Sequence, residues 1–143
     1  MKLTNKILFT PLILLTSFNT FAIHPDDLGL EKLGTIPDEE AEMIVWSYLP
    51  SSIKKNGNLR NVWVYQNHFA KSSLDNDGQV ISYYSAKAYV QFNCNEQYGY
   101  LSVHLHEGRD WEGKVHSEDY ENPKYKYIAP NSVVHKLQEI VCK

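Results

Sequence analysis

The sequence YYSAKAYVQFNC, at residues 83–94, alternates between two kinds of side chain along its whole length. Every second side chain is mostly apolar, and this series ends with a cysteine: Tyr84, Ala86, Ala88, Val90, Phe92 and Cys94. The positions between them are mostly polar: Tyr83, Ser85, Lys87, Tyr89, Gln91 and Asn93. A period of two residues predicts a β-strand with one buried face and one wet face. Another element must therefore cover the apolar face, on which the cysteine is the last residue.

The C-terminal segment is the one element with a free apolar stripe. Asn131 or Ser132 can cap a helix there, directly after Pro130. Apolar residues then recur at spacings of three and four: Val133, Val134, Leu137, Ile140 and Val141. This spacing predicts an amphipathic helix of about ten residues, which is too short to be stable alone in water. Cys142, the only other cysteine, follows it, so we expect a Cys94–Cys142 disulfide that fastens the helix to the strand.

Residues 1–22 have the pattern of a secretory signal peptide. Lys2 and Lys6 precede an uncharged stretch that runs from residue 7 to residue 22. Cleavage would leave residues 23–143 outside the cytoplasm, where two cysteines normally form a disulfide. The alternatives are an uncleaved N-terminal anchor and two free thiols. No cysteine lies near the cleavage point, so we expect no lipid anchor. We expect the mature protein to have no stable membrane insertion and to be located in the periplasm, at the cell surface or outside the cell as a secreted protein.

The charge of the expected mature chain excludes one class of partner. The signal peptide contains two of the 14 lysines and arginines and none of the 17 acidic residues, so its removal changes the net charge from −3 to −5. An acidic protein of this size is not expected to bind nucleic acid through bulk electrostatics.

The mature chain divides into an acidic arm, residues 23–41, and a single domain, residues 42–143. The arm contains two prolines and two glycines without a clear period, which is typical of a loop. In the domain, Asn56-Gly57 and Asp77-Gly78 are turn signals between β-branched, aromatic segments. We expect an α+β fold: an antiparallel meander sheet of five or six strands, one C-terminal helix packed on one face, and one disulfide.

Four segments resemble the surface-adhesin protein E-like family of Gram-negative bacteria. They are SSIKKNGNLRNVWV, YYSAKAYVQFNC, GKVHS and YKYIAPNSVVHKLQEIVC, within a match from Met43 to the C-terminus. The resemblance implies an antiparallel sheet with a C-terminal helix and a cysteine pair, which agrees with the prediction from the residues. It also implies adhesion, that is, binding to host extracellular-matrix proteins or cell surfaces. The chain departs from lipid-anchored adhesins because it lacks an N-terminal cysteine.

The wet face of the predicted sheet is the candidate binding surface. Tyr83, Lys87 and Tyr89 share it on one strand, and Tyr100 and His104 are expected beside them on the next. Exposed aromatic groups of this kind mark interaction surfaces, because tyrosine provides contact area at low entropic cost. The alternative is a set of cross-strand aromatic pairs that stabilise the sheet.

His104 and His106 are the weak candidates for a metal or haem site. Both project from one face of a strand, and His116 or Glu107 would have to complete the ligand set. Two histidines are half of a tetrahedral site, so solvated histidines are the alternative, and we expect no cofactor.

No motif for nucleophilic, metalloprotease or phosphate chemistry occurs in the sequence. We therefore expect an exported, non-enzymatic binding protein that resembles adhesins for host matrix proteins. The alternative is a periplasmic protein-binding partner or an immunity-type inhibitor, for example one that neutralises a toxin.

Overall fold

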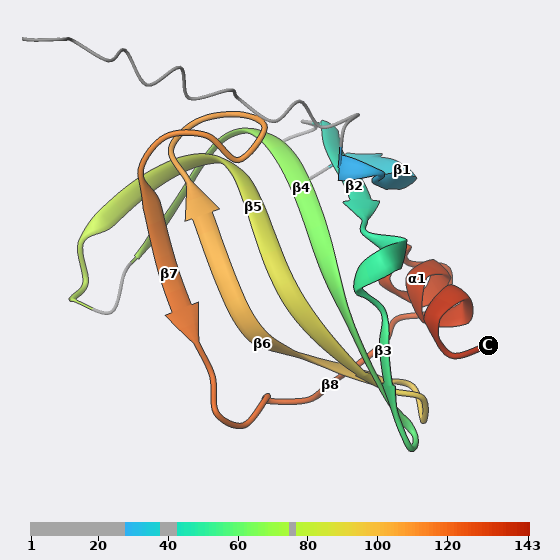
Figure 1. Cartoon of the computed structure of the whole chain (residues 1–143). Helices are drawn as coiled ribbons and strands as arrows, with labels where there is room; N and C mark the ends of the chain where they lie inside the picture. The colour runs from blue at the N-terminus through green and yellow to red at the C-terminus, as the bar shows by residue number, and fades with distance from the viewer. Residues whose placement is uncertain (1–27, 38–42, 75–76) are drawn as a thin grey trace, which may run out of the picture.

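The computed structural model describes residues 28–37, 43–74 and 77–143. The expected signal peptide and both ends of the expected arm, residues 23–27 and 38–41, lie outside these ranges. Within them, the chain forms one antiparallel sheet and a C-terminal helix, α1 (Val133–Val141), as Figure 1 shows. The strands are β1 (Glu31–Pro37), β2 (Met43–Tyr48), β3 (Lys54–Asn56), β4 (Leu59–Leu74), β5 (Val80–Asn93), β6 (Gln97–His106), β7 (Val115–Asp119) and β8 (Lys126–Tyr127).

The strand order is β1-β2-β4-β5-β6-β7, and the two shortest strands extend existing edges. β3 shares an edge of β4 with β2, and β8 shares an edge of β6 with β7. The meander and its helix are as predicted, but the described residues form a sheet of eight strands rather than five or six. None of the described helices is long and apolar enough to cross a lipid bilayer.

Strand β1 is the main departure from the expected fold. Residues 31–37 were expected in an acidic arm, yet they pair with β2 from Glu31 to Pro37, with Leu33 as an extra residue in the ladder. Leu33 is 3% exposed and belongs to the core, while its carbonyl oxygen accepts a hydrogen bond from the Lys136 ammonium at 2.5 Å. This strand was not predicted from the sequence because Gly34 and Pro37 are both typical of loops. Pairing with β2 and contact with α1 outweigh the weak preference of these two residues for a strand.

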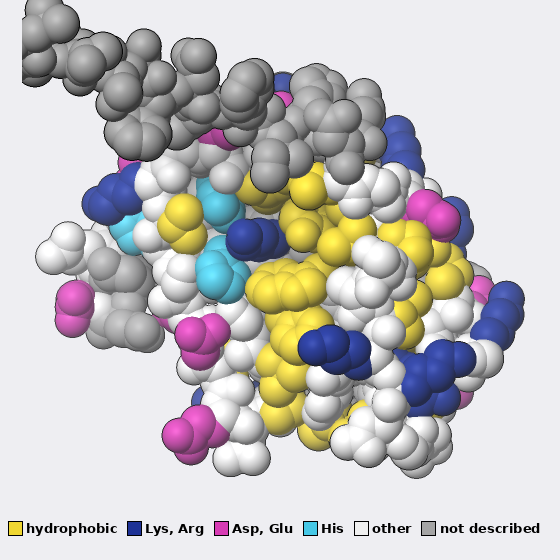
Figure 2. Space-filling view, viewed as in Figure 1, with side chains coloured by type: hydrophobic (Ala, Val, Ile, Leu, Met, Phe, Trp, Pro, Cys, Tyr) yellow, Lys and Arg dark blue, Asp and Glu magenta, His cyan; other side chains and the backbone are white. Residues whose placement is uncertain are grey.

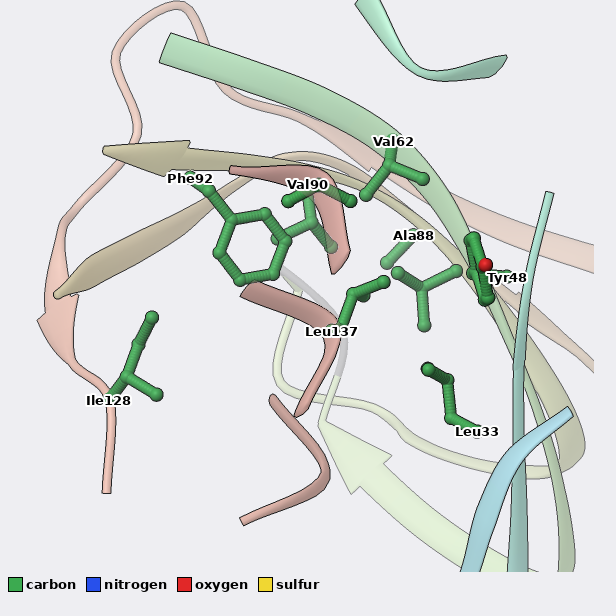
Figure 3. Packing of buried hydrophobic residues seen from close by; sticks show 10 residues of the cluster. Leu33, Tyr48, Val62, Ala88, Val90, Phe92, Ile128 and Leu137 are labelled. Atoms are coloured by element: carbon green, nitrogen blue, oxygen red, sulfur yellow. The ribbon is translucent and has the colours of Figure 1, made fainter. Parts of the chain in front are cut away.

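The core lies between the sheet and α1, as the close-up in Figure 3 shows. Val62, Val90 and Phe92 project from adjacent strands toward the side chain of Leu137 on the helix. The other buried members of the cluster are Leu33, Tyr48, Val64, Ala88, Ile128 and Val141. The helix begins at the predicted position, where the Ser132 hydroxyl accepts a hydrogen bond from the His135 amide at 3.0 Å.

A disulfide joins Cys94 to Cys142, as predicted, with the two Cα atoms 5.8 Å apart. It connects the turn after β5 to the residue directly after α1. On the chain-entropy model, closing a loop of this length stabilises the fold by about 4 kcal/mol. The bond therefore holds the helix over the end of the sheet that is richest in core residues.

Two irregularities in the strand ladders curve the sheet and change which side chains share a face. Between β5 and β6, Tyr89 pairs with Ser102 but Val90 pairs with Tyr100, so Leu101 is an extra residue. A second shift in the β4–β5 ladder follows Asn67. Bulges increase strand twist, and the end of the β4–β5 hairpin curls behind β6 and β7 (Figure 1). The sheet consequently has a concave face, which carries α1, and an open convex face.

Candidate functional site

The open face carries a group of aromatic and basic side chains from three strands, which we call the aromatic patch: Trp63, Tyr65, Lys87, Tyr89 and His104. Cross-strand pairing explains their proximity. Trp63 lies opposite Tyr89, and Lys87 lies opposite both Tyr65 and His104, so all five side chains project from one face. Figure 2 shows histidine, lysine and hydrophobic side chains side by side over these strands.

Ring stacking fixes the centre of the aromatic patch. The rings of Trp63 and Tyr89 stack with centroids 5.0 Å apart and planes 27° apart, and the His104 ring lies 5.7 Å from Trp63. The Lys87 ammonium is 5.9 Å from the Trp63 ring centroid, at the outer limit of a cation–π contact. The patch is therefore a rigid platform in which a positive charge lies beside two rings.

His104 is oriented by two serines. Its Nε2 is 2.7 Å from the Ser102 hydroxyl, and its Nδ1 is 2.9 Å from the Ser117 hydroxyl on β7. Burial and the nearby Lys87 lower the pKa of His104, and Asp119 opposes this shift. The imidazole is therefore neutral at physiological pH, and both ring nitrogens already have hydrogen-bond partners.

The loop at residues 107–114 folds over one end of the open face. Trp111 lies in this loop, before β7 begins at Val115, and has a φ of 64°. The indole N–H of Trp111 donates to the Ala86 carbonyl at 3.2 Å, and its ring meets Tyr65 edge-on at 4.7 Å. Trp111 therefore extends the aromatic patch.

Two further anchors hold this loop against the sheet. The Asn67 amide donates to the Asp110 carboxylate at 2.9 Å, and the Asp110 backbone N–H donates back to Asn67 at 3.1 Å. The Ser85 hydroxyl donates to the Gly108 carbonyl at 2.6 Å and accepts from the backbone N–H of Trp111 at 2.9 Å. Ser85 is fully buried because the loop covers it.

His106 is buried next to this loop and is 4% exposed. Neither of its ring nitrogens has a hydrogen-bond partner among the described residues. Burial, followed by the nearby Lys87 and His104, lowers the pKa of His106 to about 4, and the Trp111 backbone opposes this shift only weakly. The neutral ring therefore contributes packing beneath the loop.

The metal-site hypothesis required a third ligand close to His104 and His106. His116 pairs with Leu105 and so projects from the opposite face, where its Nε2 lies 3.1 Å from the Glu107 carboxylate. Across residues 28–37, 43–74 and 77–143, no group of three or more His, Cys, Asp or Glu side chains is arranged to hold a metal ion.

The structure separates the five residues expected on the binding face. Lys87, Tyr89 and His104 lie together on the open face, as their alternation indicated. Tyr100 lies on the concave face instead, because the extra residue Leu101 reverses the alternation along β6. Tyr83 also faces the concave side, where it lines a cavity together with Tyr100, because the β4–β5 ladder is irregular between Ser85 and Tyr83. Placing these two tyrosines on the wet face was wrong.

Sequence reasoning also missed three members of this surface: Trp63, Tyr65 and Trp111. The period-two pattern of β4 already contained the signal for the first two, since Trp63 and Tyr65 alternate with the apolar Val62 and Val64. Trp111 could not be placed, because its position depends on hydrogen bonds between distant segments.

Comparisons with known proteins agree on one family. The family model described as surface-adhesin protein E matches residues 37–143. Crystal form II of Haemophilus influenzae protein E is similar over 68% of this chain and 79% of its own, at 12% identity and a TM-score of 0.51. Another structure of Haemophilus influenzae protein E covers 80% of this chain and 93% of its own, at 12% identity and a TM-score of 0.50. No curated protein sequence matches the chain.

Proposed function

The chain belongs to the surface-adhesin protein E family, and from that premise we propose that it is an exported, non-enzymatic adhesin module. Its partner is a protein of the host extracellular matrix, and its contact surface is the aromatic patch together with Trp111. The family match supports the class of activity. The position of the aromatic patch on the face opposite α1 is the observation that supports the choice of surface.

Three properties of the aromatic patch suit protein recognition. Tryptophan and tyrosine are the residues most enriched among those that dominate binding energy in protein interfaces. The stacked Trp63 and Tyr89 rings are already ordered, so binding costs little side-chain entropy. The Lys87 ammonium adds a charge that an acidic or carbonyl-rich partner can neutralise. The module needs no reactive group for this activity.

A paired substitution tests the surface. The double variant Lys87→Ala, Tyr89→Ala removes the charge and half of the ring stack, and we expect at least tenfold weaker binding to immobilised matrix proteins. The matched control is Lys126→Ala, Tyr127→Ala, because this lysine and tyrosine lie on β8 and are exposed, with Tyr127 at 80%. The control should bind like the wild type.

Surface plasmon resonance against a panel of purified matrix proteins gives the affinities, and thermal melting shows whether both variants are folded. Equal losses in the two variants would reject the aromatic patch as the contact surface.

Cell fractionation tests the adhesin role separately. An adhesin must be reached by protease or antibody added to intact cells. Recovery from the periplasm alone would overturn this role and favour a bacterial envelope protein as the partner.

A further inference from the structure

The concave face contains a cavity of about 500 Å³, on the side of the sheet opposite the aromatic patch. It lies between the curled end of the β4–β5 hairpin and strand β7, whose arrangement Figure 1 shows. Small-molecule sites in proteins have volumes in this range. The floor and walls include the aliphatic side chains Leu74, Ile81, Ala86, Ala88, Val103 and Leu105. Ala86 and Ala88 leave room above the sheet where larger residues would fill the space.

Three tyrosines line the cavity from three different strands or their ends. Tyr83 comes from β5, Tyr100 from β6, and Tyr120 directly follows β7. The Tyr120 hydroxyl donates a hydrogen bond to the Glu118 carboxylate, which is also part of the lining. Their rings provide π-faces, and their hydroxyls provide hydrogen-bond donors and acceptors.

These hydroxyls stay protonated over the physiological range. Burial, together with the neighbouring Tyr98 and Tyr83, raises the pKa of Tyr100 to about 12. The hydrogen bond to Glu118, together with burial, raises the pKa of Tyr120 to about 12. These tyrosines therefore carry no charge over this range.

Among the described residues, the lining contains the acidic Asp77 and Glu118 and no lysine or arginine; its one histidine, His116, lies with Nε2 3.1 Å from the Glu107 carboxylate. Lys71 pairs with Tyr83 across the hairpin, where its ammonium opposes the effect of burial on the tyrosine, and it is not among the lining residues. Two carboxylates and three aromatic faces favour a cation over an anion.

We propose that this cavity binds a small aromatic amine. Its ring lies over Ala86 and Ala88 among the tyrosines, and its ammonium group pairs with the Glu118 carboxylate beside the Tyr120 hydroxyl. The site is on the opposite face from the aromatic patch, so it does not depend on the proposed adhesin function.

Two indole derivatives that differ in charge test the proposal. Tryptamine carries an ammonium group, whereas indole-3-propionate has the same ring and a carboxylate. In NMR titrations of the purified protein, tryptamine should shift the methyl resonances of Ala86 and Ala88 and bind at least fivefold more tightly than indole-3-propionate. Equal affinities, no binding up to millimolar concentration, or shifts restricted to the aromatic patch would overturn the proposal.

A matched pair of variants on β7 tests whether the Glu118 carboxylate pairs with the ammonium group of the ligand. Glu118→Gln should weaken tryptamine binding roughly fivefold to tenfold and leave indole-3-propionate binding no weaker, because it removes one half-exposed charge partner. Asp119→Asn makes the same chemical change at the next residue, which projects from the opposite face, and should keep wild-type affinity. Wild-type affinity in Glu118→Gln, or an equal loss in both variants, would contradict the assignment of Glu118.

Discussion

Leu101 has no partner across the β5–β6 ladder, and this extra residue determines the role of the tyrosines near it. With regular alternation, Tyr100 would join His104 on the open face. Because Leu101 interrupts the ladder, Tyr100 lies with Tyr98 on the concave side, where their rings meet edge-on at 5.9 Å. One unpaired residue therefore divides the aromatic side chains between a binding surface and a cavity.

His106 should make the fold sensitive to acid. Its pKa of about 4 in the folded protein lies below the ordinary value of 6.5, so the unfolded chain binds the proton more readily. The free energy of unfolding should fall as the pH decreases from about 6.5 to about 4, and this contribution should be constant above and below that window. His106→Phe removes the titrating group, and the variant should lose less stability than the wild type over the same interval.

Urea denaturation at several pH values, followed by fluorescence, measures this difference. His135→Gln, which replaces a helix histidine, is the control and should retain the wild-type pH dependence. Identical slopes for wild type and His106→Phe between pH 6.5 and 4 would contradict this role for His106.

At the scale of elements, α1 depends on its covalent link to the sheet. A helix of nine residues has little stability of its own, so packing of Leu137 and Val141 and the disulfide must hold it in place. Replacing Cys94 and Cys142 by alanine should lower the free energy of unfolding by about 4 kcal/mol, and the melting temperature by roughly 10–20 °C.

Calorimetry with and without reductant measures this effect. Reductant should lower the melting temperature of the wild type and leave the double alanine variant unchanged. A wild-type melting temperature that does not respond to reductant would show that the bond contributes nothing to stability.

The elements that could be predicted are those whose signal lies within one segment. The alternation of residues 83–94 indicated β5, the three- and four-residue spacing indicated α1, and the two cysteines indicated their bond. Strand β1 could not be recognised, since Gly34 and Pro37 resemble a loop until β2 pairs with them. The bulge at Leu101 and the position of Trp111 depend on the partner strands, so the face of Tyr100 and the place of Trp111 could be assigned only from the structure.

At the scale of the whole molecule, the curved sheet separates two surfaces of different character. The open face presents rings with a lysine and belongs, in our proposal, to a macromolecular partner. The concave face holds α1 over the core and, beside it, a cavity lined by tyrosines and carboxylates. Both surfaces follow from one antiparallel meander whose bulges make it curve.

Hydroxyl-radical footprinting of the protein, free and bound to a matrix protein selected from the panel, tests the central claim most directly. The account predicts that Trp63, Tyr89 and Trp111 become protected on binding, while Tyr100 in the cavity and Tyr127 on β8 keep their free reactivity. Protection of Tyr100 or Tyr127, with Trp63 and Tyr89 unchanged, would contradict it.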